Sequence, residues 1–385
     1  MRILLAGETF SPNLGDGLLF ESLRQQVVAL GCQVQAFDLS GRSGYERVSG
    51  PVPEEISVRR SFKHSALQRS GLVRQAASLG QWQRVRYEWS ELAGKALSDC
   101  DAVLIHGGQL ISGYNLTFAL RLRELIHMAQ RQGKRVALVG LGSDRELPTT
   151  VRKLFAPSFE SSAYISVRDL SSAAEIRSVA RQQVHVTPDL IFGMSIHEGA
   201  PLEGVLQNTA GINVQARSIF TRWSSYDVDS LYSLFHIWAR DEFAQKNSVA
   251  FGNGDPMDAR EVESLARVGS IDLAPRPSSP QELLHVVRRL DSCIAMRMHA
   301  GLASAAAGAS VLSVAWDPKV AGVWELALSS VGRDARATPI VSLQRLLTLS
   351  GHDIEGMSTR FTPDELGELA SLVRTGVATA VDSLS

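Results

Sequence analysis

The feature that most constrains this chain is an alternation of short apolar runs with longer stretches of helical periodicity. The runs cover residues 3–6, 34–39, 102–105, 136–139 and 164–167 in the first half, and residues 211–214, 249–252, 293–296 and 311–315 in the second. Apolar runs of this length, separated by helical stretches, are typical of buried parallel strands joined by helical crossovers. The pattern therefore predicts an α/β fold built on parallel sheets.

A pause in this alternation near residues 195–208 divides the chain into two parts. Because 385 residues exceed what one hydrophobic core usually supports, we predict one Rossmann-like, doubly wound domain over residues 1–200 and a second over residues 205–350. A capping box that begins at Thr362 predicts an amphipathic helix within residues 360–385, with one apolar face formed by Leu366, Leu369, Leu372, Val373 and Val377. The Gly- and Arg-rich residues 41–80 predict a mobile insertion. By fold analogy, we expect the glycosyltransferase-B-like arrangement, with ligands in the cleft between two lobes.

Charge and cysteine content exclude several kinds of partner. The 39 basic and 40 acidic residues nearly cancel, so no overall field attracts nucleic acid. The three cysteines lie far apart in the sequence, and no zinc motif or other metal cluster is visible, so we expect no metal site. No apolar run reaches the roughly 18 residues of a membrane span, and the first residues read as a strand instead of a signal peptide. We expect a cytoplasmic protein.

Polar residues that follow the predicted strands are the candidate site residues, because ligands of parallel sheets bind beyond the carboxyl ends of the strands. Asn13 and Asp16 flank a glycine turn before a helix, a place that favours an anion or a substrate oxygen. A helix N-cap is the simpler interpretation of Asp16. Gly107 and Gly108 allow a ligand to approach the backbone, although a tight turn also explains them. A lipase-type oxyanion loop is excluded because the chain has no G-x-S-x-G motif.

Two further candidates follow the last strands of the first half. Arg168 stands where a guanidinium can bind a carboxylate or phosphate in a two-pronged manner, and a surface ion pair is the alternative. Asp169, next to it, is expected to cap the following helix. Asp189 is expected to initiate a turn or to position a cation or a hydroxyl group.

The most informative candidates lie in the second half. Arg297 and His299 follow the strand over residues 293–296, and Asp317 is expected to cap a helix whose first residue is Pro318. Lys319 then lies in a first helical turn, where the helix dipole repels a cation unless an anion is near. Taken singly, a solvated lysine and a buried, hydrogen-bonded histidine explain these residues equally well. Together they indicate an anion site with an acid/base group.

These motifs, in this order, resemble those of the polysaccharide pyruvyl transferase family. The resemblance spans roughly residues 3–325 and rests on Asn13-Leu14-Gly15-Asp16, Gly107-Gly108, Val167-Arg168-Asp169, Pro188-Asp189, Arg297-Met298-His299-Ala300 and Lys319-Val320. It departs from the family pattern at three places. Gln109 replaces a third glycine, Gly140-Leu141-Gly142 lacks the usual glutamine, and Met298 replaces leucine.

The resemblance implies an enzyme that transfers a pyruvyl group from phosphoenolpyruvate to sugar hydroxyls of a polysaccharide or glycolipid precursor, forming a pyruvate ketal. It implies that Arg168, His299 and Lys319 contact the donor, with Arg297 beside them, that His299 is the general acid/base, and that Asp16 orients or deprotonates the acceptor. No cofactor besides the donor is implied. A lipid-linked acceptor would allow peripheral association with a membrane, and the oligomeric state is left open. A nucleotide-sugar glycosyltransferase of similar shape and a catalytically silent binding member are the alternatives.

Overall fold

The computed structural model describes residues 1–45, 71–113, 116–194, 196, 209–223, 227–243, 246–268, 271–315 and 317–385. The domain boundary expected near residues 195–208 therefore lies outside the described residues apart from Ile196, and its position stays a prediction. The same holds for residues 46–70 of the expected insertion. None of the helices in the described ranges combines the length and the apolar character needed to cross a membrane.

The first half forms a six-stranded parallel sheet covered by helices. Its strands are β1 (Arg2–Gly7), β2 (Gln33–Asp38), β3 (Ala102–His106), β4 (Val136–Leu141), β5 (Tyr164–Val167) and β6 (His185–Val186). Its helices are α1 (Leu14–Ala29), α3 (Gly71–Ser98), α4 (Leu116–Arg131), α5 (Thr149–Glu160), α6 (Leu170–Arg177) and the short 3-10 helix η2 (Leu190–Gly193). The expectation of an insertion as far as residue 80 is wrong at its end, because residues 71–80 are the first turns of α3.

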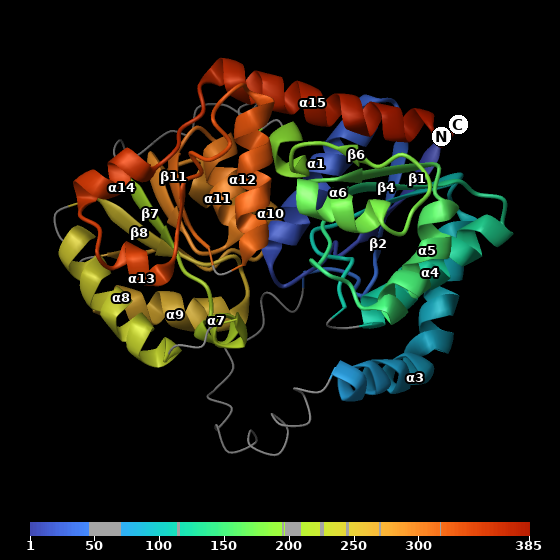
Figure 1. The fold of residues 1–385 in the computed structure, drawn as a ribbon, viewed down its shortest axis with the longest axis horizontal. Helices are drawn as coiled ribbons and strands as arrows, with labels where there is room; N and C mark the ends of the chain where they lie inside the picture. Colours follow the sequence, from blue (N-terminus) through green and yellow to red (C-terminus); the bar gives the residue numbers. More distant parts are fainter. Residues whose placement is uncertain are drawn as a thin grey trace.

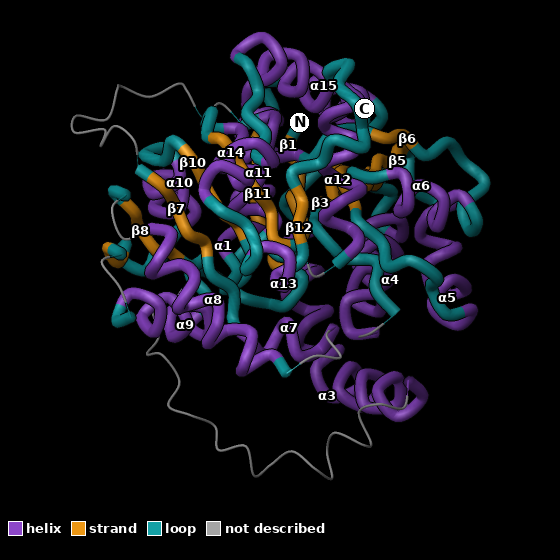
Figure 2. Tube along the Cα trace, turned by 60° about the vertical axis from the view of Figure 1, so that its left-hand side comes forward, coloured by secondary structure: helices purple, strands orange, loops and turns teal. Residues whose placement is uncertain are grey.

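The second half repeats this design. Its strands are β7 (Ala210–Asn213), β8 (Ser248–Phe251), β9 (Asp272–Leu273), β10 (Ser292–Ala295), β11 (Ser310–Val314) and β12 (Ile340–Val341), again all parallel. Its helices are α7 (Arg217–Trp223), α8 (Val228–Phe243), α9 (Pro256–Ala266), α10 (Pro280–Val287), α11 (Met298–Ala306), α12 (Pro318–Ser330), α13 (Leu343–Leu346), α14 (Gly351–Met357) and α15 (Pro363–Asp382). Figure 2 shows these strands running between layers of helices.

The strand orders show where ligands should bind. The second sheet has the order β12-β11-β10-β7-β8-β9, which is that of dinucleotide-binding Rossmann sheets. The first sheet has the order β2-β1-β3-β4-β5-β6, which is the flavodoxin-like variant. The winding reverses between β1 and β3 in one sheet and between β7 and β10 in the other. The predicted doubly wound α/β fold is confirmed, and its two reversal points mark the expected binding edges.

Side-chain caps fix where the helices of the second half begin. Asp255, Ser279, Asp317 and Thr362 each accept a hydrogen bond from a backbone N–H of the first turn, and a proline follows each of them. A proline fits there because its missing N–H would have no helical partner. Thr362 also forms a capping box with Glu365. The expected caps at Asp317 and Thr362 are confirmed.

Helix α15 ties the two halves together. It lies along one side of the molecule, from the second half back to the first, and its end lies near the amino terminus (Figure 1). Its buried face includes Val373 and Val377, which share one hydrophobic cluster with Leu18 of α1 and Leu302 of α11. The expectation that Leu372 belongs to this face is wrong, since its side chain is exposed.

Candidate active site

Side chains from both halves meet where the carboxyl ends of the two sheets face each other. Asp16 comes from α1, Arg168 follows β5, and His299 lies in the first turn of α11. The imidazole of His299 lies 2.9 Å from the Arg168 guanidinium and 3.6 Å from the Asp16 carboxylate. Residues from distant parts of the sequence therefore form one polar cluster. The structure brings together four of the predicted site residues: Asp16, Arg168, Asp189 and His299.

The contacts of His299 fix the position of its proton. Arg168 Nη1 donates to His299 Nε2, because a guanidinium has no acceptor. A neutral ring must then carry its proton on Nδ1, which faces Asp16 Oδ1 at 3.6 Å, too far for a hydrogen bond. His299 is buried, with a relative exposure of 6%. One ring nitrogen is thus a proton acceptor and the other faces a carboxylate.

The electrostatics of His299 favour the neutral ring in the absence of a ligand. Burial is the largest influence and lowers the pKa of His299, and the positive charges of Arg168 and Arg297 lower it further. The carboxylates of Asp189 and Asp16 oppose this by raising it. An anion bound beside the ring would act as these carboxylates do and would also raise the pKa of His299. The protonation of His299 is therefore coupled to the charge of whatever binds here.

Arg168 and Asp189 form a buried ion pair at the edge of the first sheet. Arg168 Nη1 donates to Asp189 Oδ2 at 3.1 Å, and both side chains are less than 5% exposed. Asp189 also caps η2 by accepting from Ile191 N, and Asp169 caps α6 as expected. The alternative of a surface ion pair for Arg168 is wrong. The Nε atom of Arg168 is buried without a hydrogen-bond partner, so one strong donor remains unused.

Glycines let these groups approach one another. A Cβ atom on Gly15 would lie 2.7 Å from His299 Cβ, which is a steric clash. A Cβ atom on Gly108 would lie 3.5 Å from each of Arg168 Nη1, Asp16 Oδ1 and His299 Cε1, so Gly108 borders the polar cluster directly. Gly107 instead faces Leu110. Of the two predicted glycines, only Gly108 touches the space that the charged groups share.

Asp16 does not cap α1, and the N-cap interpretation of this residue is wrong. Helix α1 begins at Leu14, so Asp16 lies in its first turn, and Asn13 occupies the cap position. The Asn13 side-chain amide donates to Asp16 Oδ2 at 3.2 Å. Asn13 therefore orients the carboxylate that faces His299.

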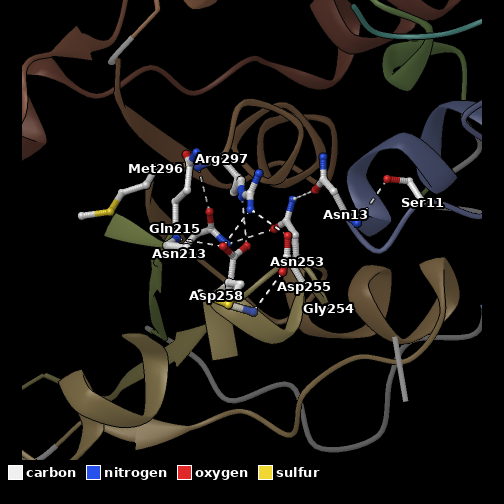
Figure 3. A network of polar contacts seen from close by, with 12 residues as sticks. Ser11, Asn13, Asn213, Gln215, Asn253, Gly254, Asp255, Asp258, Met296 and Arg297 are labelled. Atoms are coloured by element: carbon white, nitrogen blue, oxygen red, sulfur yellow. Dashed lines mark hydrogen bonds and ion pairs between the residues drawn. The ribbon is translucent and has the colours of Figure 1, made fainter. Parts of the chain in front are cut away.

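The Asn13 side chain belongs to a chain of amides that sequence reasoning missed (Figure 3). Asn213 Nδ2 donates to Asn253 Oδ1 at 3.1 Å, and Asn253 Nδ2 donates to Asn13 Oδ1 at 3.2 Å. Asn213 Oδ1 accepts from the backbone N–H of Arg297 at 3.0 Å. The chain links the Asp16 side of the site to the start of α11. Asn253 lies in a glycine-rich turn just after β8. Its position beyond the end of a strand is the feature of the sequence that could have identified it as a site residue.

Arg297 lies beside the cluster, but carboxylates of its own half already bind its guanidinium. Its Nε and Nη2 atoms donate to Asp258 at 2.9 and 2.7 Å, and Asp255 lies 3.5 Å away (Figure 3). These two carboxylates raise the pKa of Arg297 although burial, the largest influence, acts to lower it. Arg297 is the N-cap residue of α11, two positions before His299. Its ion pairs therefore hold the start of the helix that carries His299.

Lys319 is also paired. Its ammonium group lies 2.7 Å from Asp144 Oδ1, in the first half, and 3.8 Å from Asp317 Oδ2. Lys319 is in the first turn of α12 and is buried, so the alternative of a solvated lysine is wrong. Trp316, which precedes Asp317, lies outside the described residues. Asp144 was not among the predicted site residues.

Glu8, the residue after β1, is a second acidic group that sequence reasoning missed. Burial raises the pKa of Glu8 to about 8, the charges of Asp16 and Asp38 act in the same direction, and Arg42, 3.6 Å away, opposes them. Glu8 therefore holds its proton to a higher pH than an ordinary glutamate does. Within the described part of the chain, no three His, Cys, Asp or Glu side chains are grouped so that they could hold a metal ion.

A cavity of about 620 Å³ lies far from this cluster. Its lining includes Ala210, Ser292 and Ser310, which are the first residues of β7, β10 and β11. These are the amino ends of the strands, whereas ligands of parallel sheets bind at the carboxyl ends. Size alone does not make this cavity the active site.

Solved structures share the fold over nearly the whole chain. A UDP-GlcNAc 2-epimerase from Neisseria meningitidis bound to UDP-GlcNAc is 12% identical, with a TM-score of 0.50 over 99% of this chain and 100% of that one. A UDP-GlcNAc 2-epimerase from Methanocaldococcus jannaschii is 11% identical, with a TM-score of 0.52 over 96% and 97%. A trehalose-6-phosphate synthase is 11% identical, with a TM-score of 0.52 over 100% and 99%. These likenesses show the two-domain, glycosyltransferase-B-like fold.

Sequence comparison identifies the family. No curated protein matches the chain in sequence. Residues 13–318, however, match the sequence model of the polysaccharide pyruvyl transferases. The matched range includes Asp16, Arg168, Asp189 and His299, the four residues of the polar cluster. The chain therefore belongs to the polysaccharide pyruvyl transferase family.

Proposed function

We propose that this protein transfers a pyruvyl group from phosphoenolpyruvate to hydroxyl groups of a sugar in a polysaccharide or glycolipid precursor. The observation that carries the proposal is the buried contact between His299 and Arg168, with Asp16 on the other side of the ring. This arrangement combines a cation for an anionic donor with a group that can move a proton.

In this proposal the donor binds between the two halves. Its phosphate and carboxylate replace the carboxylates that now neutralise the basic side chains. Arg168 offers an unused Nε donor, and Lys319 approaches from the opposite half. Arg297 holds His299 in place through the backbone of α11, and Gly108 leaves room beside the ring. Donor binding then requires both halves.

The proton moves through His299. The donor dianion raises the pKa of the imidazole, which takes up a proton on Nε2 while Asp16 stabilises the charge at Nδ1. His299 gives this proton to the methylene carbon of the donor, and the electron pair of the double bond forms the new C–H bond. A sugar hydroxyl attacks the resulting oxocarbenium carbon and loses its proton to the neutral ring or to a nearby carboxylate, either Asp16 or Asp189.

Two outcomes are open to this intermediate. Cleavage of the carbon–oxygen bond releases phosphate, and attack by a second hydroxyl closes the pyruvate ketal, with its proton leaving on the phosphate. Loss of a methyl proton instead of the second attack gives an enolpyruvyl ether. We favour the ketal, which adds one carboxylate to the sugar.

Partners and location follow from the same proposal. The acceptor is a sugar or a lipid-linked saccharide, and a lipid-linked one would bring the protein to a membrane surface without a spanning helix. No cofactor besides the donor is needed for these steps. We place the protein in the cytoplasm, because Cys32, Cys100 and Cys293 are free thiols that suit a reducing compartment.

A nucleotide-sugar glycosyltransferase is the second candidate, because one structure of similar fold is bound to UDP-GlcNAc. Phosphoenolpyruvate is expected to raise the melting temperature in proportion to its saturation of the site, whereas UDP- and GDP-sugars are expected to leave it unchanged. At 100 times the dissociation constant, the ligand should stabilise the fold by about 2.7 kcal/mol. Thermal unfolding with both ligand classes is the test. A shift with nucleotide sugars alone would favour the glycosyltransferase, and binding without turnover would indicate a silent member.

A further inference from the structure

The Asp144 carboxylate lies two residues after Gly142, in the loop that follows β4. Gln109, which departs from the motif that the chain otherwise resembles, lies close to it. The side-chain amide of Gln109 donates to Asp144 Oδ1, which is also the oxygen that Lys319 binds at 2.7 Å. Gln109 of the first half and Lys319 of the second half thus bind the same carboxylate oxygen.

The first half holds Asp144 firmly. Ser112 Oγ and the backbone N–H of Gly113 donate to its Oδ2 at 2.7 and 2.9 Å. The backbone N–H of Asp144 itself donates to Ile111 O at 2.8 Å. Gly140, with a φ of 64°, allows the irregular end of β4 that directs this segment toward the second half. The carboxylate is therefore fixed in place by hydrogen bonds that do not depend on Lys319.

Lys319 reaches this carboxylate from the other half of the molecule. Its side chain is only 10% exposed and that of Asp144 is 20% exposed, so water screens the pair weakly. Asp317, at 3.8 Å, is the more distant carboxylate. The Asp144 carboxylate therefore neutralises the one lysine that the donor is proposed to use.

We propose that Asp144, oriented by Gln109, is a positioning residue that acts through Lys319 as an internal counter-ion and sets the affinity for the anionic donor. The inference rests on the proposed function, since it requires an anion at Lys319. The donor must replace Asp144 at the ammonium group, so part of its binding free energy is spent on breaking an existing ion pair. The donor therefore binds more weakly than it would if Asp144 carried no charge. Bound product or phosphate is released more readily for the same reason.

The test measures the affinity of the full chain for phosphoenolpyruvate and for inorganic phosphate by calorimetry. Asp144→Asn keeps the size of the side chain and an acceptor for Ser112 and Gly113 but removes the charge. We expect both ligands to bind at least about fivefold more tightly to this variant, the lower end of typical coupling between sites. Gln109→Gly, which restores the family glycine, should give a smaller change in the same direction. Asp241→Asn, at a surface ion pair with 63% exposure, removes the same charge elsewhere and should change nothing.

A double-variant cycle separates this role from a structural one. In a Lys319→Met background, Asp144→Asn should no longer alter ligand affinity, because its partner is gone. Unchanged or weaker binding of phosphoenolpyruvate by folded Asp144→Asn, with normal binding by the unmodified protein, would overturn the counter-ion inference and leave the proposed function standing. If Asp144→Asn binds phosphate more tightly but shows no preference for phosphoenolpyruvate over phosphate, the role of Asp144 as a counter-ion would be supported. The identification of phosphoenolpyruvate as the donor would be contradicted. Binding of neither ligand to either protein would overturn both.

Discussion

Replacement of His299 by glutamine is expected to lower turnover by about 10²- to 10⁴-fold, the usual cost of removing a positioned acid/base. Glutamine retains polarity and approximate volume at a buried site but cannot carry the proton that the ring moves. The Arg168 guanidinium can still donate to the glutamine oxygen, so we expect the fold to survive. The pH dependence of kcat/KM that arises from His299 should disappear with the ring.

The matched control is His352→Gln, on the exposed face of α14, which should leave turnover unchanged. The direction of the pH effect follows from the lowered pKa of free His299. If the ring must be protonated to act as the acid, kcat/KM should fall as the pH rises above that pKa. Near-normal turnover of a folded His299→Gln protein on its true acceptor would make His299 a structural residue and direct the search for the proton donor to Asp16 or Asp189.

Removal of the Arg168 guanidinium is expected to cost both stability and donor binding. Arg168→Ala leaves Asp189 buried without its counter-charge, and breaking one partner of a buried pair costs about 3 to 5 kcal/mol of unfolding free energy. Arg168→Lys keeps a positive charge but loses the planar fork that binds an anion with two parallel N–H groups. It should weaken donor binding by about 2 kcal/mol or more. Denaturant unfolding and calorimetry measure the two effects.

A second pair of variants separates the two effects. Arg168→Ala combined with Asp189→Asn removes both charges, so it should recover much of the lost stability without restoring donor binding. Arg181→Lys is the control for the arginine-to-lysine change, because the Arg181 side chain is 93% exposed and should contribute little. Full donor affinity in the folded Arg168→Ala/Asp189→Asn protein would remove Arg168 from the donor site.

The parallel sheets were predictable because their central strands are buried on both faces and therefore read as apolar runs. All nine predicted runs coincide with strands to within one or two residues. The two-residue edge strands β6, β9 and β12 lie outside these runs, because each is too short to show a periodicity. The order of the strands in each sheet was not predictable from the sequence pattern either, since it depends on which face of the sheet each crossover helix packs against. The first sheet accordingly has a flavodoxin-like order that no local pattern indicates.

The candidate site was predictable as far as it lies directly beyond strand ends. Arg168 and His299 follow β5 and β10 closely, so the strand pattern together with the family motifs pointed to them. Charge pairing between distant segments was not predictable. Lys319 and Asp144 are 175 positions apart and lie in different halves. Arg297 is neutralised by Asp258 of α9, which lies in its own half. Such pairs depend on tertiary packing, which also partly desolvates Glu8 and raises its pKa.

The cluster around His299 is proposed to transfer a pyruvyl group from phosphoenolpyruvate to a sugar. The direct measurement is incubation of the protein with phosphoenolpyruvate and a panel of glycans and lipid-linked saccharides, with phosphate release and product mass followed together. We expect release of one phosphate for each pyruvyl group gained by the acceptor, and loss of both signals in His299→Gln. Glycan extension from a nucleotide sugar, with no phosphate released from phosphoenolpyruvate on any acceptor, would contradict it.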